Sequence, residues 1–412
     1  MIETAYTAPS AFGRLQQRSL IVGAVGTVLL VIGFFINPTQ GFQASLIGFL
    51  FWLGISVGSL ALLMLQHLTG GGWGLVIRRT LEAATRVLPY TALMFLVVLV
   101  GAYRGSIYPW TDQALMAESE ALAIKAHGFL NLRFFTVRAL VYFAIWILLA
   151  FFLNQWSAAQ DRKDDRRLAR NMRVLSGPGL VLFVFTVTFA SIDWVMSLDP
   201  VWSSTIFGLL FVAAWSLSAL AFAIAMLAVQ AAHEPMSKVV APLHFHDLGK
   251  LLLALVMLWA YFAFSQFLII WSGNLPEEIQ WYLPRTKGGW GTVALVVVIL
   301  HFALPFLFLL SRSLKRDPHK LVLVAGLILV MRFIDLLWVI KPNPTFSGAK
   351  FRISWMDPIA LIGFGGVWFF LFLRELRQWP VMPINDPQMP SVLEQARDAD
   401  HHGADFIEES AA

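Results

Sequence analysis

The 412-residue chain contains no cysteine. Disulfide bonds, iron–sulfur clusters held by thiolates and covalently attached c-type haem are therefore excluded from this chain. Charged residues are also scarce, at 13% of the chain, whereas a soluble domain usually carries about 25%. A shortage of charge on this scale is typical of a protein that spans a membrane.

Hydrophobic residues make up 58% of the chain, which is more than a buried core requires. They form continuous runs close to the length of about 20 residues that crosses a bilayer as a helix. Because the runs do not alternate with polar residues, they predict helices and exclude a barrel. The net charge of +5 lies in the loops between the runs, where it sets topology and does not indicate a nucleic-acid binder.

The sequence predicts an all-α integral membrane protein with about ten transmembrane helices. The expected spans are residues 19–36, 44–65, 88–102, 134–153, 179–198, 205–229, 248–271, 291–310, 321–340 and 357–373. Residues 1–18 are polar and no cleavage site follows the first run, so we expect a retained N-terminal segment. Residues 375–412 carry prolines and many acids, and they predict a flexible or partner-docked tail after the membrane domain of residues 19–374.

The distribution of positive charge predicts the orientation. If both termini are cytoplasmic, the loops on that side hold 19 of the 30 lysines and arginines, and the opposite loops hold 8. In this count, Arg78, Arg79 and Arg86 are cytoplasmic loop residues. The positive-inside rule therefore favours cytoplasmic termini.

A weak internal repeat divides the spans. Asp193 and Asp335 each follow an isoleucine and precede a proline by seven residues. Both lie near the ends of outward-running spans that are four spans apart. The repeat predicts two four-helix bundles, formed by spans two to five and six to nine, with the first and tenth spans as flanking helices.

Ionisable residues inside these spans are candidates for function, because burying them in lipid costs several kcal/mol unless they are paired or hydrated. Arg332 and Asp335 share a helix face, and Arg138 can pair with Asp193 from the neighbouring span. His301 lies near the middle of span eight, four residues before Pro305. The predicted proton path comprises Asp247, Lys250, Tyr261, Ser265, His301, Arg332 and Asp335. The alternative is that these groups form structural ion pairs, interhelical hydrogen bonds and a helix kink.

The outer end of the first bundle collects aromatic and proton-exchanging side chains, which suit a quinol headgroup. The possible quinone-binding residues are Trp110, His127, Arg138, Asp193 and Trp194. The alternative is an ordinary interfacial belt of aromatic residues. His301 is the one histidine deep within a span, so a b-type haem held by two histidines is excluded. We therefore expect this chain to bind no metal and no redox cofactor of its own, with quinone as its possible ligand.

Three stretches of the sequence carry a resemblance to a known family. They are QHLTGGGWG from residue 66 with Arg78-Arg79, DWVMSLDP from residue 193 with WSSTIFG from residue 202, and HFHDLGK from residue 244 with WAYFAFSQ and NLPEE. Together they resemble the second NrfD-like membrane subunit of bacterial alternative complex III, a quinol:cytochrome c oxidoreductase. That family is related to the membrane subunit of polysulfide reductase. The resemblance covers residues 15–375.

The resemblance implies a ten-helix protein in the bacterial inner membrane that acts as one subunit of a respiratory complex. The implied partners are a multihaem cytochrome c subunit, an iron–sulfur subunit of the molybdopterin-enzyme type, a sister NrfD-like subunit, small membrane subunits and a terminal oxidase. The haem c and iron–sulfur clusters would lie on these partners. The resemblance implies quinone interaction, proton conduction or both for this chain. Two alternatives remain open at this point, a purely structural anchor and a stand-alone secondary transporter.

Overall fold

The computed structural model describes residues 9, 11–347, 350–383, 385–390, 392 and 394. Within these residues the chain is helical and contains no strand. Among the described residues, nine helices are long and apolar enough to cross a membrane, and counting the pair α3 and α4, bent by 41° at Val87, as one span brings the total to ten. The predicted all-α membrane fold with about ten spans is therefore confirmed.

The first half of the chain alternates long crossings with short helices at one end. Its elements are α1 (Ala11–Ile36), α2 (Pro38–Thr69), α3 (Gly72–Arg86), α4 (Leu88–Tyr103), η1 (Pro109–Thr111), α5 (Gln113–Met116), α6 (Glu120–Gly128), α7 (Leu132–Arg162), α8 (Arg166–Trp194) and η2 (Met196–Leu198). The side chains of Asn37, Asn131 and Asp165 each accept a hydrogen bond from a backbone amide in the first turn of the following helix. These caps fix where α2, α7 and α8 begin.

The second half of the chain also combines long crossings with short helices. Its elements are α9 (Phe207–Ala231), η3 (Met236–Lys238), α10 (Pro242–Gly273), α11 (Pro276–Ile279), α12 (Leu283–Thr286), α13 (Gly288–Val297), η4 (Val298–Ala303), α14 (Leu304–Leu310), α15 (Arg312–Arg316), α16 (Pro318–Ile340) and α17 (Met356–Gln378). The segment η4 is a π-helical turn that joins α13 and α14 into one crossing. The side chain of Asp317 accepts hydrogen bonds from two backbone amides and caps α16.

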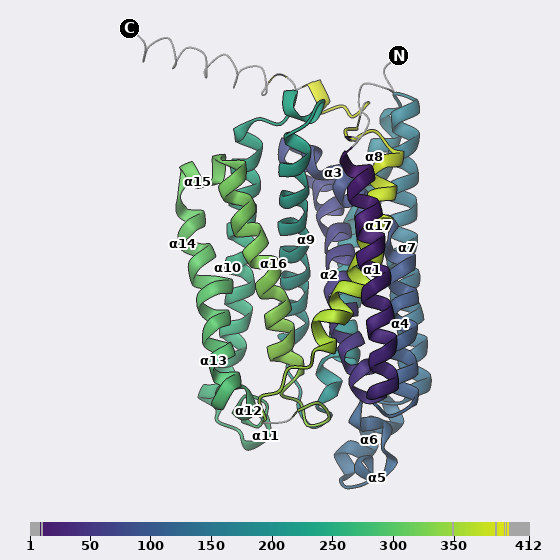
Figure 1. Cartoon of the computed structure of the whole chain (residues 1–412), viewed down its shortest axis with the longest axis vertical. Coiled ribbons are helices and arrows are strands. Elements are labelled where there is room, and N and C mark those ends of the chain that lie inside the picture. The colour runs from purple at the N-terminus through teal and green to yellow at the C-terminus, as the bar shows by residue number, and fades with distance from the viewer. Residues whose placement is uncertain are drawn as a thin grey trace.

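The crossings form two four-helix rings, as the internal repeat predicts. In bundle one, α2 contacts α4 and α8, and α7 contacts the same two helices. In bundle two, α9 contacts α10 and α16, and the α13–η4–α14 crossing closes the ring between them. Helix α9 also packs against α2 and α8, so the bundles share one continuous core. The predicted arrangement of two bundles with two flanking helices is confirmed (Figure 1).

Both ends of the membrane domain lie on one side of the molecule. Helix α1 begins and α17 ends at the top of Figure 1, which we call the chain-end face. The short helices α5, α6, α11 and α12 lie at the bottom, which we call the opposite face. Asp193 and Asp335 both lie in the half of the domain nearer the opposite face, because α8 and α16 end there.

The flanking helices α1 and α17 pack together through glycine. A Cβ atom on Gly26 would lie 2.6 Å from the Cα of Gly363, and one on Gly366 would lie 2.3 Å from the backbone nitrogen of Gly23. The two backbones therefore touch, as they do where small residues join membrane helices. Helix α17 in turn packs on α2, so this contact attaches α1 to bundle one.

Replacing Gly366 with leucine is expected to separate α1 from α17. The new side chain has only backbone in front of it and cannot be accommodated by a rotamer change, so we expect a loss of about 1–3 kcal/mol of stability. The midpoint of thermal unfolding in detergent measures this loss. Gly326→Leu on α16 is the matched control, because a Cβ there meets no atom within 4 Å. Equal midpoints for the two variants would contradict the backbone contact.

Candidate functional site

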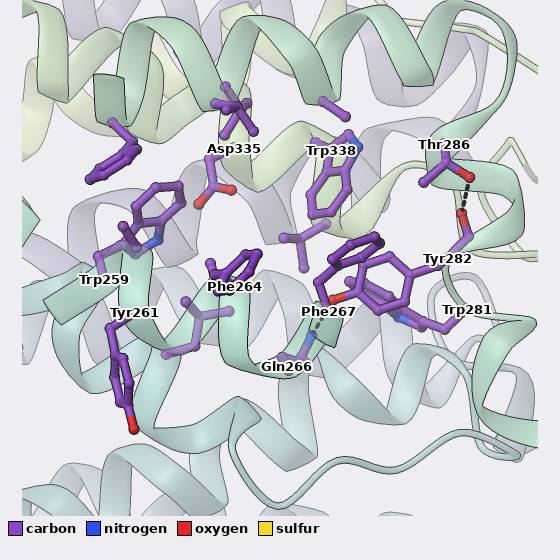
Figure 2. Close-up of a pocket in the computed structure, with 18 of the residues that line it drawn as sticks. Trp259, Tyr261, Phe264, Gln266, Phe267, Trp281, Tyr282, Thr286, Asp335 and Trp338 are labelled. Carbon is purple, nitrogen blue, oxygen red and sulfur yellow. Dashed lines mark hydrogen bonds between the residues drawn. The ribbon is translucent and has the colours of Figure 1, made fainter. Parts of the chain in front are cut away.

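Bundle two contains a cavity of about 600 Å³. It lies between α10, the α13–η4 segment and α16, with α12 at one end (Figure 2). Most of its wall is aromatic or aliphatic. The residues that line it are Leu210, Met257, Trp259, Ala260, Tyr261, Ala263, Phe264, Gln266, Phe267, Trp281, Tyr282, Thr286, Ala294, Val297, Val298, Phe302, Asp335, Trp338 and Val339.

The cavity opens to the side of the bundle. Phe264 of α10 is 61% exposed and Val298 of η4 is 56% exposed, although both line the cavity. These two residues lie on helices whose outer faces carry many exposed apolar side chains. The cavity is therefore accessible from the apolar outer side of the bundle, beside Phe264 and Val298.

Asp335 supplies a carboxylate to the wall of this cavity. Its side chain pairs with Arg332 one turn earlier on α16, and both residues are less than 5% exposed. Figure 2 shows the carboxylate pointing into the space near Trp259 and Phe264. A buried carboxylate on an apolar surface can accept a hydrogen bond and a proton from a ligand. The predicted pairing of Arg332 with Asp335 is present.

A second polar group lies at the other end of the cavity. The side-chain amide of Gln266 donates a hydrogen bond to the hydroxyl of Tyr282 over 3.3 Å and accepts one from Ser204 over 3.3 Å. Burial raises the pKa of Tyr282 to about 12, so its hydroxyl remains a donor at neutral pH. Figure 2 shows this pair on the far side of Phe264 from Asp335. The cavity thus offers polar contacts at two separated places along an apolar slot.

Arg285 holds the aromatic end of the cavity in place. Its guanidinium lies 3.6 Å from the ring of Trp281 and donates hydrogen bonds to the carbonyl oxygens of Trp281 and Val339 over 2.5 and 2.7 Å. The Arg285 carbonyl accepts a hydrogen bond from the indole of Trp338 over 3.1 Å. Burial lowers the pKa of Arg285 to about 9. Arg285 is one of the eight basic residues assigned to the opposite loops by the positive-charge count, and its neighbours Trp281 and Tyr282 were the available signal of a buried position.

His301 lies inside bundle two in the π-helical turn. Its ring meets that of Trp259 edge to face, with the centroids 4.4 Å apart. Neither ring nitrogen has a hydrogen-bond partner among the described residues, and the same is true of Nη2 of Arg332. Pro305 lacks an amide proton, and the π-helical turn accommodates this break. Such turns are frequent at functional sites.

The remaining residues of the predicted proton path lie toward the surface. Lys250 and Asp247 pair over 3.1 Å, with side chains that are 57% and 39% exposed. Tyr261 lines the rim of the cavity but is 63% exposed, and its hydroxyl points away from Asp335 in Figure 2. Ser265 is half-buried on the same helix. The structure therefore brings Tyr261 and Asp335 to one cavity and leaves Asp247 and Lys250 outside it.

In bundle one, the predicted pair of Arg138 and Asp193 is also present. The guanidinium of Arg138 contacts both carboxylate oxygens of Asp193 over 2.6–3.1 Å, and Tyr142 donates a hydrogen bond to the same carboxylate over 2.7 Å. Arg138 also lies 3.8 Å from the ring of Phe129. Both oxygens of Asp193 are therefore occupied by groups of the protein itself.

The aromatic residues predicted to bind quinone at bundle one are part of a packed interior. Trp194 is fully buried among Phe49, Phe95 and Phe143. Trp110 is 4% exposed and stacks on Tyr108, whereas His127 is exposed on α6. The structure thus does not bring the five predicted residues together around one space. Bundle one is filled around Trp194, whereas bundle two is hollow beside Asp335.

Comparison with known proteins adds no assignment. No family model matches the sequence, and no curated protein matches it either. Among the described residues, no three histidine, aspartate or glutamate side chains come together in a way that could hold a metal ion. The features of the described residues that indicate a function are the cavity and the buried polar groups around it.

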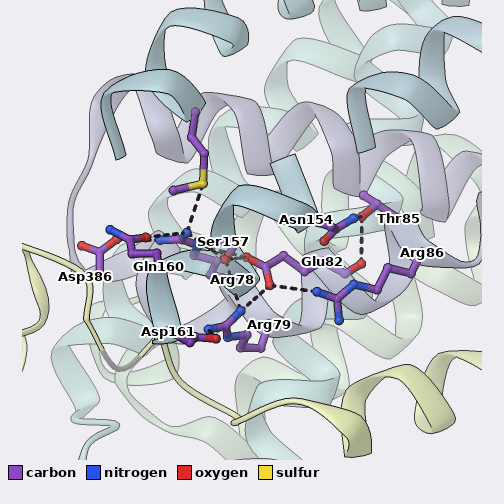
Figure 3. A network of polar contacts seen from close by, with 11 residues as sticks. Arg78, Arg79, Glu82, Thr85, Arg86, Asn154, Ser157, Gln160, Asp161 and Asp386 are labelled. Atoms are coloured by element: carbon purple, nitrogen blue, oxygen red, sulfur yellow. Dashed lines mark hydrogen bonds and ion pairs between the residues drawn. The ribbon is translucent and has the colours of Figure 1, made fainter. Parts of the chain in front are cut away.

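Figure 3 shows a buried network of charges in bundle one, built on α3, which lies near the chain-end face in Figure 1. Glu82 of α3 contacts Arg78 over 3.0 Å and Arg79 over 2.7 Å, and accepts a hydrogen bond from Ser157 of α7 over 2.6 Å. Arg79 also pairs with Asp161. The prediction that Arg78, Arg79 and Arg86 lie in a loop is wrong, because residues 72–86 form a helix packed against α2 and α7.

Part of the segment after α17 docks onto this network. Asp386 pairs with Arg78 over 2.6 Å, and the side-chain amide of Asn385 donates to the carbonyl oxygens of Gln160 and Asp161. Gln388 accepts a hydrogen bond from the amide of Gly71 over 3.0 Å. The predicted tail therefore begins with residues that pack on the chain itself, and residues 395–412 lie outside the described part.

Proposed function

We propose that this chain is the quinone-interacting membrane subunit of a respiratory quinol oxidoreductase of the alternative complex III type. In this proposal it lies in the bacterial inner membrane with both termini in the cytoplasm. The observation that carries the proposal is the bundle-two cavity, which is an apolar, aromatic slot open to the bilayer with a carboxylate in its wall. The resemblance of three sequence stretches to this family agrees with it.

The cavity matches the chemistry of a quinol headgroup. A quinol is a flat ring with a hydroxyl at each end, and it needs an apolar slot with one polar partner for each oxygen. Asp335 accepts a hydrogen bond from one hydroxyl, and Gln266 or Tyr282 contacts the other oxygen. The isoprenoid tail leaves through the opening beside Phe264 and Val298.

Oxidation of quinol to quinone releases two protons and two electrons. Asp335 takes a proton from the ring hydroxyl, while Arg332 stabilises the carboxylate between transfers. The unpaired ring nitrogens of His301 offer the next position for a proton, and the unpaired Nη2 of Arg332 can donate a hydrogen bond to a water molecule. Iron–sulfur clusters or haem on partner subunits, which the family resemblance implies, would accept the two electrons.

Filling the cavity tests the proposal. Ala263→Trp on α10 is expected to weaken binding of a short-tailed quinone by about 10–100-fold, because overpacking a site costs about 1–3 kcal/mol. Binding to the purified full chain can be followed as quenching of tryptophan fluorescence, since Trp259, Trp281 and Trp338 line the cavity.

The matched control is Ala24→Trp, which adds the same bulk to an exposed position on α1. This control variant should leave the dissociation constant of the quinone unchanged. Unchanged quinone binding in Ala263→Trp, with the variant folded, would exclude this cavity as the quinone site.

A further inference from the structure

A second hollow lies on the surface of bundle one, separate from the quinone cavity. It is a groove of about 570 Å³ near the chain-end face, which we call the α7 groove. It is bounded by α3, α4, α7 and the end of α17. The residues that line it are Thr85, Arg86, Pro89, Ile147, Ala150, Phe151, Asn154, Gln155, Ala158, Ala159, Arg162, Glu375 and Trp379.

The end of the groove nearer the chain-end face carries charge. Arg86 lies at the end of α3 and stacks on Trp379, with its guanidinium 4.5 Å from the ring. Arg162 is the last residue of α7, is exposed and makes no ion pair with a described residue. Glu375 is the one carboxylate in the lining, so the two arginines leave the groove with a net positive charge.

Besides the indole nitrogen of Trp379, two buried polar atoms in the lining have no hydrogen-bond partner among the described residues. One is Nη2 of Arg86, whose nearest carboxylate oxygen, on Glu82, is 3.8 Å away. The other is Oδ1 of Asn154, a residue that is 7% exposed and uses its amide nitrogen to donate to Thr85 over 2.9 Å. A buried donor and a buried acceptor are thus left for a ligand that supplies the complementary groups.

The other end of the groove is apolar and faces outward. Ile147, Ala150 and Phe151 of α7 continue toward the middle of the membrane domain, and Phe151 is 55% exposed. Asn154 is eight residues before Arg162, which places it about 12 Å deeper along the helix. The groove is therefore charged near the membrane surface and apolar farther in, which is the order of headgroup and acyl chains in a bilayer lipid.

We propose that the α7 groove binds an anionic phospholipid. Its phosphate lies between Arg86 and Arg162, a hydroxyl of its headgroup donates to Oδ1 of Asn154, and an acyl chain follows Ile147 and Phe151. Basic pockets between membrane helices near the membrane surface are suited to such headgroups. Free phosphate carries the same negative charge, but it has no apolar part that could contact the apolar half of the groove.

Binding of phosphatidylglycerol to the delipidated full chain, compared with phosphatidylcholine, tests the proposal. Native mass spectrometry should show that the chain retains phosphatidylglycerol in preference to phosphatidylcholine. Arg162→Gln is expected to weaken this binding about 5-fold, and the double variant Arg86→Gln/Arg162→Gln about 25-fold, since each basic residue near anionic lipid contributes about a 5-fold factor. Arg312→Gln, which removes an exposed arginine from the same face of bundle two, is the control and should bind normally.

Two further measurements separate the possible outcomes. Asn154→Asp places a negative charge beside the phosphate and should also weaken binding, whereas the same variant should bind phosphatidylcholine unchanged. Competition by inorganic phosphate at millimolar concentration would show that the groove recognises a free anion and would overturn the lipid assignment. Equal retention of the two lipids, or equal binding by Arg162→Gln and Arg312→Gln, would overturn the proposal altogether.

Discussion

Replacing Asp335 with leucine is expected to destabilise the protein by about 3–5 kcal/mol and to abolish quinone binding. The destabilisation follows because Arg332 would keep its charge inside the bundle without a partner. The loss of binding follows because the cavity would lose the carboxylate that accepts a hydrogen bond from the quinol hydroxyl. Thermal unfolding in detergent measures the first effect, and quenching of tryptophan fluorescence by a short-tailed quinone measures the second.

The double variant Arg332→Met/Asp335→Leu separates a structural role from a functional one. Removing both charges leaves no unpaired ion, so the unfolding midpoint is expected to return close to that of the original protein. Quinone binding should remain absent, and quinol turnover in the assembled complex should stay lower by about 100-fold or more, the scale of a lost acid–base group.

The outcome of the double variant decides between two of the functions that the sequence leaves open. A structural anchor predicts that turnover recovers together with stability, because the ion pair would serve packing alone. Recovery of both would therefore refute the assignment of Asp335 to the quinone site. A stand-alone transporter predicts substrate flux through the purified chain in vesicles without partner subunits, which our proposal does not.

Glu82→Gln is expected to have the second-largest effect, a loss of about 3–5 kcal/mol. Glu82 is 1% exposed and is shared by Arg78 and Arg79, so its neutralisation leaves an excess of buried positive charge between α3 and α7. Asp386 and Asp161 each still pair with one arginine, which limits the loss. The measurement is the unfolding midpoint of the purified full chain.

Glu118→Gln is the control for this variant, because it removes the same charge from an exposed position at the opposite face. Its midpoint should match that of the original protein. Asp386→Asn should have a smaller effect than Glu82→Gln, since it removes one of several partners of Arg78. A midpoint for Glu82→Gln equal to that of the control would show that the α3 network does not stabilise the fold.

The number and order of the spans could be predicted from the sequence because lipid imposes a simple requirement. Backbone groups in the hydrocarbon region must be satisfied within their own helix, so each crossing is a local run of apolar residues. The repeat around Asp193 and Asp335 then predicted two bundles, and the charge spacing on α16 predicted the pairing of Arg332 with Asp335. All of these signals depend on residues close together in the chain or on a repeated pattern.

The location of the cavity was decided by tertiary packing alone. Bundle one and bundle two have similar helices, yet Trp194 and its aromatic neighbours fill the first, while Trp259, Trp281 and Trp338 surround a space in the second. Whether large side chains meet or leave a gap depends on helix positions distant in sequence. The burial of Arg78, Arg79 and Arg285 was missed for the same reason, since each has, besides a partner nearby in the chain, a partner distant in sequence: Asp386, Asp161 and Val339, respectively. The sequence determined which residues lie in the membrane, and the packing of separate helices determined which of them face a ligand.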